Sequence, residues 1–261
     1  MKALSIAATG MLAQQLNVEV ISNNIANMNT TGYKRQRAEF QDLLYQNIER
    51  AGAASSDAGT VAPTGIQIGV GVRTAGVYRV TSQGELVNSE TPLDIAINGK
   101  GYFKVQLPTG EDAYTRAGSF QLSPQGEIVN SEGFPVSPGI TIPQEAIDIS
   151  INANGEVLVT IEGQLEPQNV GQFEVVTFPN NAGLQALGDN LLSETPASGA
   201  ASTGSPNTPG YGAIVQGYLE RSNVNSVAEI TQLIAAQRAY EMNSKVISTA
   251  DEMLSVTSNL R

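Results

Sequence analysis

The sequence contains no cysteine, histidine or tryptophan in its 261 residues. The lack of cysteine excludes disulfides and thiol nucleophiles, and the additional lack of histidine excludes the commonest zinc sites and every imidazole base. An enzyme of this composition would have to use carboxylates, serine, lysine or tyrosine. We therefore expect no catalytic centre, no metal site and no cofactor.

Basic residues are also scarce. The chain has 14 Lys and Arg against 25 Asp and Glu, which gives a net charge of −11. Binding to nucleic-acid phosphates needs clustered Lys and Arg, so we expect no nucleic-acid partner. The one basic cluster, Lys34, Arg35 and Arg37, is too short to change this expectation. Salt bridges to acidic residues of the same chain are its expected role.

Long apolar runs are missing too. No stretch of eighteen consecutive apolar residues occurs, so we expect no membrane insertion. The segment after Lys2 is interrupted by polar residues and by Gly10, and it lacks the compact hydrophobic region of a secretory signal peptide. These features favour a cytoplasmic protein or one exported without a cleaved signal peptide.

The two ends of the chain, residues 1–31 and 222–261, carry apolar residues at seven-residue intervals, and this spacing predicts amphipathic helices. The first helix is expected to end in the Asn-rich segment of residues 23–29, with Gly32 suited to a left-handed cap. The rows comprise Leu4, Met11, Val18, Ile21 and Ile25 at the first end and Leu233, Tyr240, Val246, Ile247, Met253 and Leu254 at the second. Each helix would be roughly 45 Å long, which exceeds the core of a small domain. We predict that these residues form an assembly interface between copies. Packing on the core of the same domain is the alternative.

The region between the helices changes to the period of two that is typical of strands. Asn98-Gly99 predicts a tight hairpin joining residues 93–97 to residues 103–107, and Asn154-Gly155 predicts a second hairpin. Ser123-Pro124-Gln125-Gly126 marks a further turn. The expected class is therefore α+β with a mostly β middle, in which residues 75–195 form an antiparallel β-rich outer domain.

The remaining segments are expected to connect the helical and β-rich parts. The connecting region comprises residues 32–74 and 196–221. Within it, residues 33–48 fit either a short helix or an extended segment, and residues 51–65 are a low-complexity arm rich in Ala, Gly and Ser. Residues 196–212, rich in Pro, Ser and Gly, are read as a linker.

Two local patterns suggest binding or catalysis, and both have simpler explanations. Gly69, Gly71 and Gly76 partly match a nucleotide-binding loop, but Thr74 occupies the third glycine position and a strand is the better interpretation. Glu111-Asp112 follows a turn and is expected to be solvated, because a glycosidase needs a second carboxylate placed by the fold.

Two motifs resemble signatures of the bacterial flagellar rod and hook protein family. The first comprises Asn23, Asn24, Asn27, Gly32, Tyr33 and Lys34; the second comprises Ser222, Asn223, Val224, Asn225, Gln237, Arg238, Tyr240, Glu241 and Asn243. Further stretches, including Ile66-Gln67-Ile68-Gly69 and Tyr114-Thr115-Arg116, are similar to the distal-rod branch of this family. The resemblance runs over nearly the whole chain and weakens most at residues 196–212.

The resemblance implies a structural role. Family members pair their terminal helices as an inner coiled-coil domain, stack as a helical homopolymer with an axial channel, and place the β-domain outside. It further implies export through the flagellar type III apparatus and a rod that crosses the periplasm inside a ring bushing. The partners would be copies of itself, other rod subunits and the hook at its ends. The expected function is therefore a rigid drive shaft that transmits motor torque.

Three other functions fit the sequence less well. A proximal-rod or hook component of the same family differs mainly in residues 46–66 and in the size of the β-domain. A secreted carboxylate-dependent hydrolase on a β-scaffold would leave both terminal apolar rows unexplained. A β-rich ligand-binding module with helical appendages is the third alternative.

Overall fold

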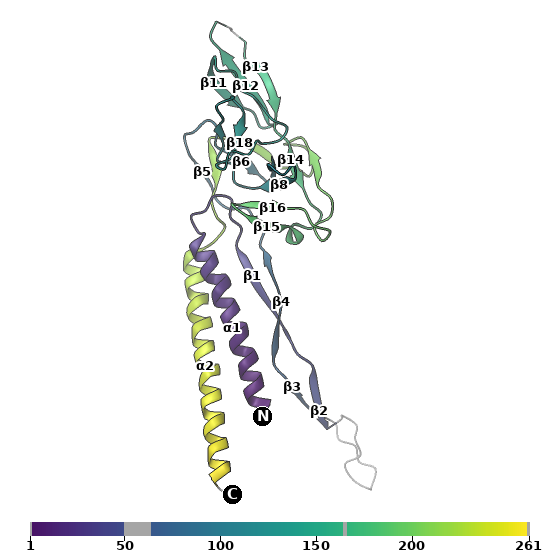
Figure 1. Cartoon of the computed structure of the whole chain (residues 1–261), viewed down its shortest axis with the longest axis vertical. Helices are drawn as coiled ribbons and strands as arrows, with labels where there is room; N and C mark the ends of the chain where they lie inside the picture. Colours follow the sequence, from purple (N-terminus) through teal and green to yellow (C-terminus); the bar gives the residue numbers. More distant parts are fainter. Residues whose placement is uncertain (1, 50–63, 164–165, 260–261) are drawn as a thin grey trace. The chain divides into compact units, whose positions relative to one another are not determined.

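A computed structural model describes residues 2–49, 64–163 and 166–259 of the chain. The described residues form an α+β protein with a helix at each end, α1 (Lys2–Ala26) and α2 (Ser226–Asn259), and strands between them (Figure 1). The expected fold class is confirmed at this level. The predicted arm at residues 51–65 lies almost entirely outside the described residues.

The described chain divides into two compact units. Of the described residues, unit 1 contains 2–25, 36–49, 64–78 and 226–259, and unit 2 contains 26–35, 79–163 and 166–225. The two terminal helices thus belong to one unit although the sequence separates them by about 200 residues. Neither helix combines the length and the apolarity that a membrane span requires over the residues described.

The helices lie within the ranges that the sequence predicted. The first ends at Ala26, inside the Asn-rich segment where its end was expected, and there Asn27 accepts a hydrogen bond from the Thr30 hydroxyl at 3.1 Å and the chain turns. Gly32 has the expected positive φ of 70°, yet it lies beyond the helix end and does not cap it. The second helix begins at Ser226, so residues 222–225 are not helical as expected.

Unit 1 also contains a two-stranded ribbon. Strand β1 (Gln36–Asp42) pairs with β4 (Val72–Arg79), and β2 (Tyr45–Glu49) pairs antiparallel with β3 (Ile66–Gly69). The extended alternative for residues 33–48 is therefore correct and the short helix is wrong. The ribbon contacts α1 where the Val72 N–H donates to the Thr9 hydroxyl at 3.3 Å.

Unit 2 is built from short strands, and every described register between them is antiparallel. The elements are β5 (Leu86–Asn88), β6 (Ile95–Asn98), β7 (Phe103–Gln106), β8 (Asp112–Thr115), β9 (Gln121–Leu122), β10 (Ile128–Val129), β11 (Ala146–Ile151), β12 (Glu156–Ile161), β13 (Gln168–Gln172), β14 (Val175–Thr177), the 3-10 helix η1 (Asn181–Gly183), β15 (Gln185–Gly188), β16 (Leu191–Ser193), β17 (Ser202–Gly204), β18 (Ala213–Gln216) and β19 (Tyr218–Glu220). The largest sheet has the order β15-β16-β8-β7, and β11, β12 and β13 form a three-stranded sheet.

Three phenylalanines lie at the centre of the main core of unit 2. The Phe103 ring packs edge-on against the rings of Phe120 and Phe173, with centroid distances of 5.1 and 6.3 Å. All three side chains are buried among Ile and Val residues of the surrounding strands. Apolar burial therefore gives this unit a core of its own, independent of the terminal helices.

The turn motifs predicted one hairpin correctly and one incorrectly. Asn154-Gly155 joins β11 to β12 in the expected hairpin, and Gly155 has a φ of 82°. Asn98-Gly99 does not join β6 to β7, because β6 pairs with β18 and β7 pairs with β8. The Ser123–Gly126 turn connects β9 to β10 as expected, with the Gly126 N–H donating to the Ser123 carbonyl at 2.8 Å.

Residues 196–221, which the sequence pattern assigned to the connecting region, contain strands of unit 2. Strands β17, β18 and β19 come from this range and pair with β14, β6 and β5. The Pro-, Ser- and Gly-rich composition reflects the tight turns between these short strands. The glycine-rich stretch around Gly71 lies at the junction of strands β3 and β4 in unit 1, which confirms the strand interpretation over a nucleotide-binding loop.

Candidate assembly site

The two terminal helices lie side by side and antiparallel in unit 1 (Figure 1). Asn24 of α1 contacts Glu229 of α2, and a Cβ built on Gly10 would lie 2.9 Å from the Asn243 side chain. From the first pair to the second, the residue number falls by 14 in α1 and rises by 14 in α2. The two helices therefore run antiparallel in a constant register. Gly10 therefore lies where the helices approach each other closely.

Small and polar side chains form the seam between the helices. Ala7 and Ala13 of α1 are buried, as are Glu229, Ala236 and Ala250 of α2. With Asn243 between them, the α2 residues follow one another at intervals of seven, the spacing of one position of a heptad. The helices thus meet through a row that the apolar pattern of the sequence did not reveal.

Bulky apolar side chains of α2 remain outside this seam. Met242, Val246 and Met253 have exposed fractions of 63%, 49% and 59%. We call these three residues the outer stripe. An exposed row of large apolar side chains on a long helix is characteristic of an interaction surface.

The structure places the predicted interface residues at three levels of exposure. Ile21 is buried; Leu4, Met11, Val18, Ile25, Leu233 and Ile247 are half-buried; Tyr240, Val246, Met253 and Leu254 are exposed. The half-buried residues flank the seam, and the exposed residues of α2 are available to another molecule.

Asn24 joins three segments of unit 1. Its side-chain oxygen accepts from the Gln36 N–H at 2.8 Å, and its amide group donates to the Gln36 carbonyl at 2.8 Å and to Glu229 Oε2 at 3.1 Å. The side chain is fully buried at 1% exposure. An asparagine amide reproduces the donor and acceptor of a peptide group, so it pairs with the start of β1 as a neighbouring strand would.

Asn223 plays the equivalent part in unit 2. Its side-chain oxygen accepts from the Arg35 N–H at 2.7 Å, while its amide group donates to the carbonyls of Val80 and Ser82, both at 2.9 Å. This bonding holds Asn223 against Arg35 and residues 80–82, three residues before α2 begins at Ser226.

Glu220 is the centre of a buried ionic cluster in unit 2. Its carboxylate accepts from Lys34 Nζ at 2.5 Å, from Arg116 Nε at 2.5 Å and from the Gly84 N–H at 2.8 Å. Burial by itself would raise the pKa of Glu220, but the charges of Arg116 and Lys34 and the hydrogen bonds outweigh burial, so the pKa lies below its ordinary value. Desolvation lowers the pKa of Lys34 despite its bond to Glu220.

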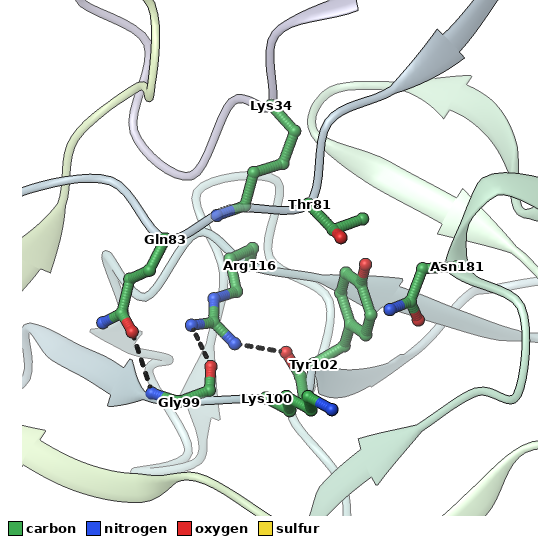
Figure 2. A pocket seen from close by; sticks show the side chains of 9 residues that line it. Lys34, Thr81, Gln83, Gly99, Lys100, Tyr102, Arg116 and Asn181 are labelled. Atoms are coloured by element: carbon green, nitrogen blue, oxygen red, sulfur yellow. Dashed lines mark hydrogen bonds between the residues drawn. The ribbon is translucent and has the colours of Figure 1, made fainter.

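Arg116 explains why the Asn98-Gly99 hairpin does not form. Its guanidinium donates to the carbonyls of Ile97 at 2.7 Å, Gly99 at 2.6 Å and Gly101 at 2.5 Å. Figure 2 shows the bond to Gly99. The backbone curls around the side chain, and the positive φ angles of Gly99 and Gly101 permit this path.

Gly32 packs against the same region. A Cβ at this position would lie 2.6 Å from the Ala117 backbone nitrogen, and the Gly32 N–H donates to the Glu220 carbonyl at 2.8 Å. Both its left-handed backbone and the lack of space require glycine here.

The other motif residues have local or surface positions. The Ser222 hydroxyl accepts from the Val224 N–H at 3.4 Å, Tyr33 is half-buried, and Asn23, Asn225 and Arg238 are exposed. Gln237, Tyr240 and Glu241 line a groove of about 330 Å³ together with Gln15, Val18 and Glu19 of α1. Across the described residues, no group of three or more acidic side chains is arranged to hold a metal ion.

Sequence reasoning missed Glu220, Glu229, Ala236 and Ala250. Glu229, Ala236, Asn243 and Ala250 follow one another at seven-residue intervals in the sequence. A search for rows of apolar residues does not detect this row, because it consists of acidic, small and amide residues. No sequence pattern singles out Glu220, because its two cationic partners lie 186 and 104 residues away.

Three family models match the chain. Residues 4–34 match "Flagella basal body rod protein", residues 96–159 match "Flagellar hook protein FlgE/F/G D1 domain" and residues 215–260 match "Flagellar basal body rod FlgEFG protein C-terminal". The outer matches include both terminal helices, and the middle match lies in unit 2.

Full-length relatives agree with these models. The chain is 62% identical to the flagellar basal-body rod protein FlgG of Caulobacter vibrioides over 261 residues, which is 100% of both chains. It is 52% identical to FlgG of Agrobacterium fabrum, over 99% of this chain and 98% of the relative. The identity to FlgG of Bacillus subtilis is 38%, over 100% and 99%.

Proposed function

The chain belongs to the flagellar basal-body rod and hook protein family, and we propose that it polymerises through its terminal helices into the distal rod. As a rod protein of the flagellar basal body, it is a structural subunit used in motility and not an enzyme. The hydrolase alternative is therefore wrong.

The proposal rests mainly on one observation, that α2 uses one set of residues to contact α1 and exposes another set. The seam toward α1 uses Ala236, Asn243 and Ala250, while the outer stripe of Met242, Val246 and Met253 is exposed. Fully burying a large apolar side chain stabilises by about 1.5–3 kcal/mol relative to full exposure, and these partly exposed side chains have not gained all of it. Covering the stripe with helices of neighbouring copies recovers this free energy and makes polymerisation favourable.

A polymer of this kind needs a heterologous interface, in which one surface of a copy binds a different surface of the next. A repeated heterologous contact that does not close into a ring generates a helical filament. In the proposed rod the paired helices form an inner coiled-coil domain around an axial channel, and the β-rich unit lies outside. Direct packing between long helices resists bending, which suits a shaft that transmits torque.

The remaining partners of the proposed rod follow from its place in a flagellum. It would cross the periplasm inside a ring bushing, contact other rod subunits at one end and the hook at the other, and reach its site through the type III export apparatus without a cleaved signal peptide. The chain's relation to rod and hook proteins supports these partners through family membership.

The nearest alternative, another rod or hook component, has weaker support. The relative named flagellar hook-basal body complex protein FlhP, from Bacillus subtilis, is 29% identical to this chain, whereas FlgG of the same organism is 38% identical. The higher full-length identities favour the distal rod.

Electron microscopy of the purified full-length chain tests the proposal. Concentrating the protein should give straight hollow tubes, and labelled protein should enter the distal rod of basal bodies isolated from a producing strain. A chain that stays monomeric at high concentration and is missing from isolated rods would contradict the proposal.

A further inference from the structure

A cavity of about 240 Å³ lies within unit 2, next to the Glu220 cluster. We call it the cationic pocket. Its lining includes Lys34, Thr81, Lys100, Tyr102, Arg116 and Asn181 (Figure 2). All of these residues belong to the same unit, and they come from five separate stretches of the chain.

The cationic pocket concentrates positive charge in a chain whose net charge is −11. Three of its side chains, Lys34, Lys100 and Arg116, carry a positive charge, whereas Glu220 is the carboxylate paired with two of them. Lys34 and Arg116 are 9% and 7% exposed, so water screens their charges less than it would at the surface. The pocket therefore favours a negatively charged occupant.

The pocket also presents hydrogen-bond donors without internal acceptors. Within the described part of the chain, the Tyr102 hydroxyl has no hydrogen-bond partner, although the residue is only 6% exposed. Figure 2 shows this hydroxyl pointing toward Thr81 and Asn181. Lys100 likewise forms no side-chain bond to any described residue. A donor that lines the pocket without an internal acceptor can bond to an occupant, and an ionised carboxylate is a pure acceptor that satisfies several donors at once.

We propose that the cationic pocket receives the carboxylate of an Asp or Glu side chain from a second copy of this chain. The inference deepens the proposed function and rests on it, because it names a polar contact between neighbouring subunits in addition to the helix packing. A carboxylate in the pocket would bond to Lys100 and Tyr102 while the Glu220 cluster holds Lys34 and Arg116 in place.

Charge complementarity favours a second copy over a free anion. Each subunit carries 25 acidic residues, and stacking copies of charge −11 creates repulsion that specific contacts must offset. Glu111, which the sequence placed in a solvated turn, is one of several exposed acidic residues on unit 2. The volume is several times the roughly 30 Å³ that one water occupies, so the pocket can admit the end of a side chain.

Carbodiimide cross-linking of assembled tubes tests the inference. This reagent joins an amine to a carboxylate in direct contact without adding a spacer, and mixing ¹⁵N-labelled with unlabelled subunits identifies links between copies. We expect a mixed-isotope link from Lys100 to an Asp or Glu. Tubes that lack such a link would overturn the inference and leave the proposed function intact, whereas a parent chain that forms no tubes would contradict both.

Substitutions at Lys100 supply an independent measurement. Lys100 is exposed and forms no internal bond, so Lys100→Gln should fold normally and raise the critical concentration for assembly about tenfold, the effect of losing one charged hydrogen bond. Lys100→Arg should assemble close to the parent. Lys104→Gln is the matched control, because Lys104 is paired with Asp112 at the surface at 2.8 Å.

Equal critical concentrations for Lys100→Gln and Lys104→Gln would overturn the inference. The alternative occupant of the pocket is an adventitious ion only, which would bind there without any contact between subunits. If added inorganic phosphate lowers the critical concentration of the parent but not of Lys100→Gln, a free anion occupies the pocket and the proposed contact is wrong. The inference requires phosphate to raise the critical concentration of the parent by competition.

Discussion

Asn24 Nδ2 of α1 lies 3.1 Å from Glu229 Oε2 of α2, and this hydrogen bond joins the two terminal helices across 205 residues of sequence. It belongs to a seam in which Gly10 of α1 meets Asn243 of α2. The α2 side of the helix pair therefore contributes mainly polar and small residues, while α1 also buries Val20 and Ile21 and the outer stripe of α2 stays exposed.

Replacing Asn24 with alanine should destabilise unit 1 by about 3 kcal/mol. The change removes three hydrogen bonds and leaves the backbone groups of Gln36 and the carboxylate of Glu229 with fewer partners. Chemical denaturation followed by helical circular dichroism measures the loss. Gln15→Ala, which removes an exposed bond to Glu19, should cost less than about 0.5 kcal/mol. Equal losses for the two variants would show that Asn24 does not hold the helix pair.

Val246→Asp should prevent polymerisation while both units stay folded. Val246 is 49% exposed in the single chain, so a carboxylate there is solvated until another copy covers it. Burying it unpaired would cost several kcal/mol. Sedimentation of the concentrated protein measures assembly, and thermal melting checks the fold. Ser244→Asp, at an exposed polar position on α2, is the control and should assemble. Tubes formed by Val246→Asp would exclude the outer stripe as an interface.

Ile247→Asp and Val18→Asp should also block assembly and leave unit 2 folded. Both residues are half-buried beside the seam, so these changes should additionally loosen the helix pair, unlike Val246→Asp. Cooperative melting of unit 2 should be unchanged because its core is separate. Loss of that melting transition would mean that the helices are part of the same core.

Acid should weaken unit 2 through Glu220. Because the folded-state pKa of Glu220 lies below its ordinary value of 4.5, the ion pairs contribute fully above that pH. Their contribution is lost as the pH falls through the depressed folded pKa. Denaturation curves at several pH values should show this loss in the parent and not in Glu220→Gln. Glu145→Gln, at an exposed carboxylate, should keep the parent's profile. If the free energy of unfolding of Glu220→Gln falls with decreasing pH as steeply as that of the parent, this assignment is wrong.

Arg116→Lys should destabilise unit 2 by about 2 kcal/mol even though it preserves the charge. Lysine cannot reach Glu220 and the carbonyls of Ile97, Gly99 and Gly101 together, because it lacks the planar fork of arginine. The free energy of unfolding measures the effect. A variant as stable as the parent would show that these carbonyl contacts contribute little.

The sequence predicted those features that depend on neighbouring residues. The seven-residue rows identified both helices, and Asn154-Gly155 identified the β11–β12 hairpin, because turn chemistry and periodicity act over a few residues. Asn98-Gly99 carries the same turn signal and was misleading. Arg116 binds the carbonyls around it, and the strand before it pairs with β18, more than 100 residues away.

The candidate site was only partly predictable for the same reason. The motif residues Lys34, Asn24 and Asn223 were singled out by resemblance, but their partners became clear only in three dimensions. Lys34 does form the salt bridge expected of the basic cluster, with Glu220. Apolar periodicity also could not tell which row of α2 faces α1, since the row in the seam is mostly small and polar.

In a dilute solution of the single chain, the terminal helices should exchange their amide hydrogens quickly. The helices bury few large apolar side chains, with Val20 and Ile21 of α1 the main ones among the described residues, so residues 4–28 and 230–257 should open far more often than the core around Phe103. Polymerisation should slow this exchange. Strong protection of both helices in the dilute chain would contradict this expectation.

Electron cryo-microscopy of tubes grown from the full-length chain tests the central claim most directly, because it locates the outer stripe in the assembled state. The account predicts a hollow tube in which Met242, Val246 and Met253 of each copy are covered by helices of neighbouring copies. Tubes in which these three side chains face solvent, with the copies joined only through unit 2, would contradict it.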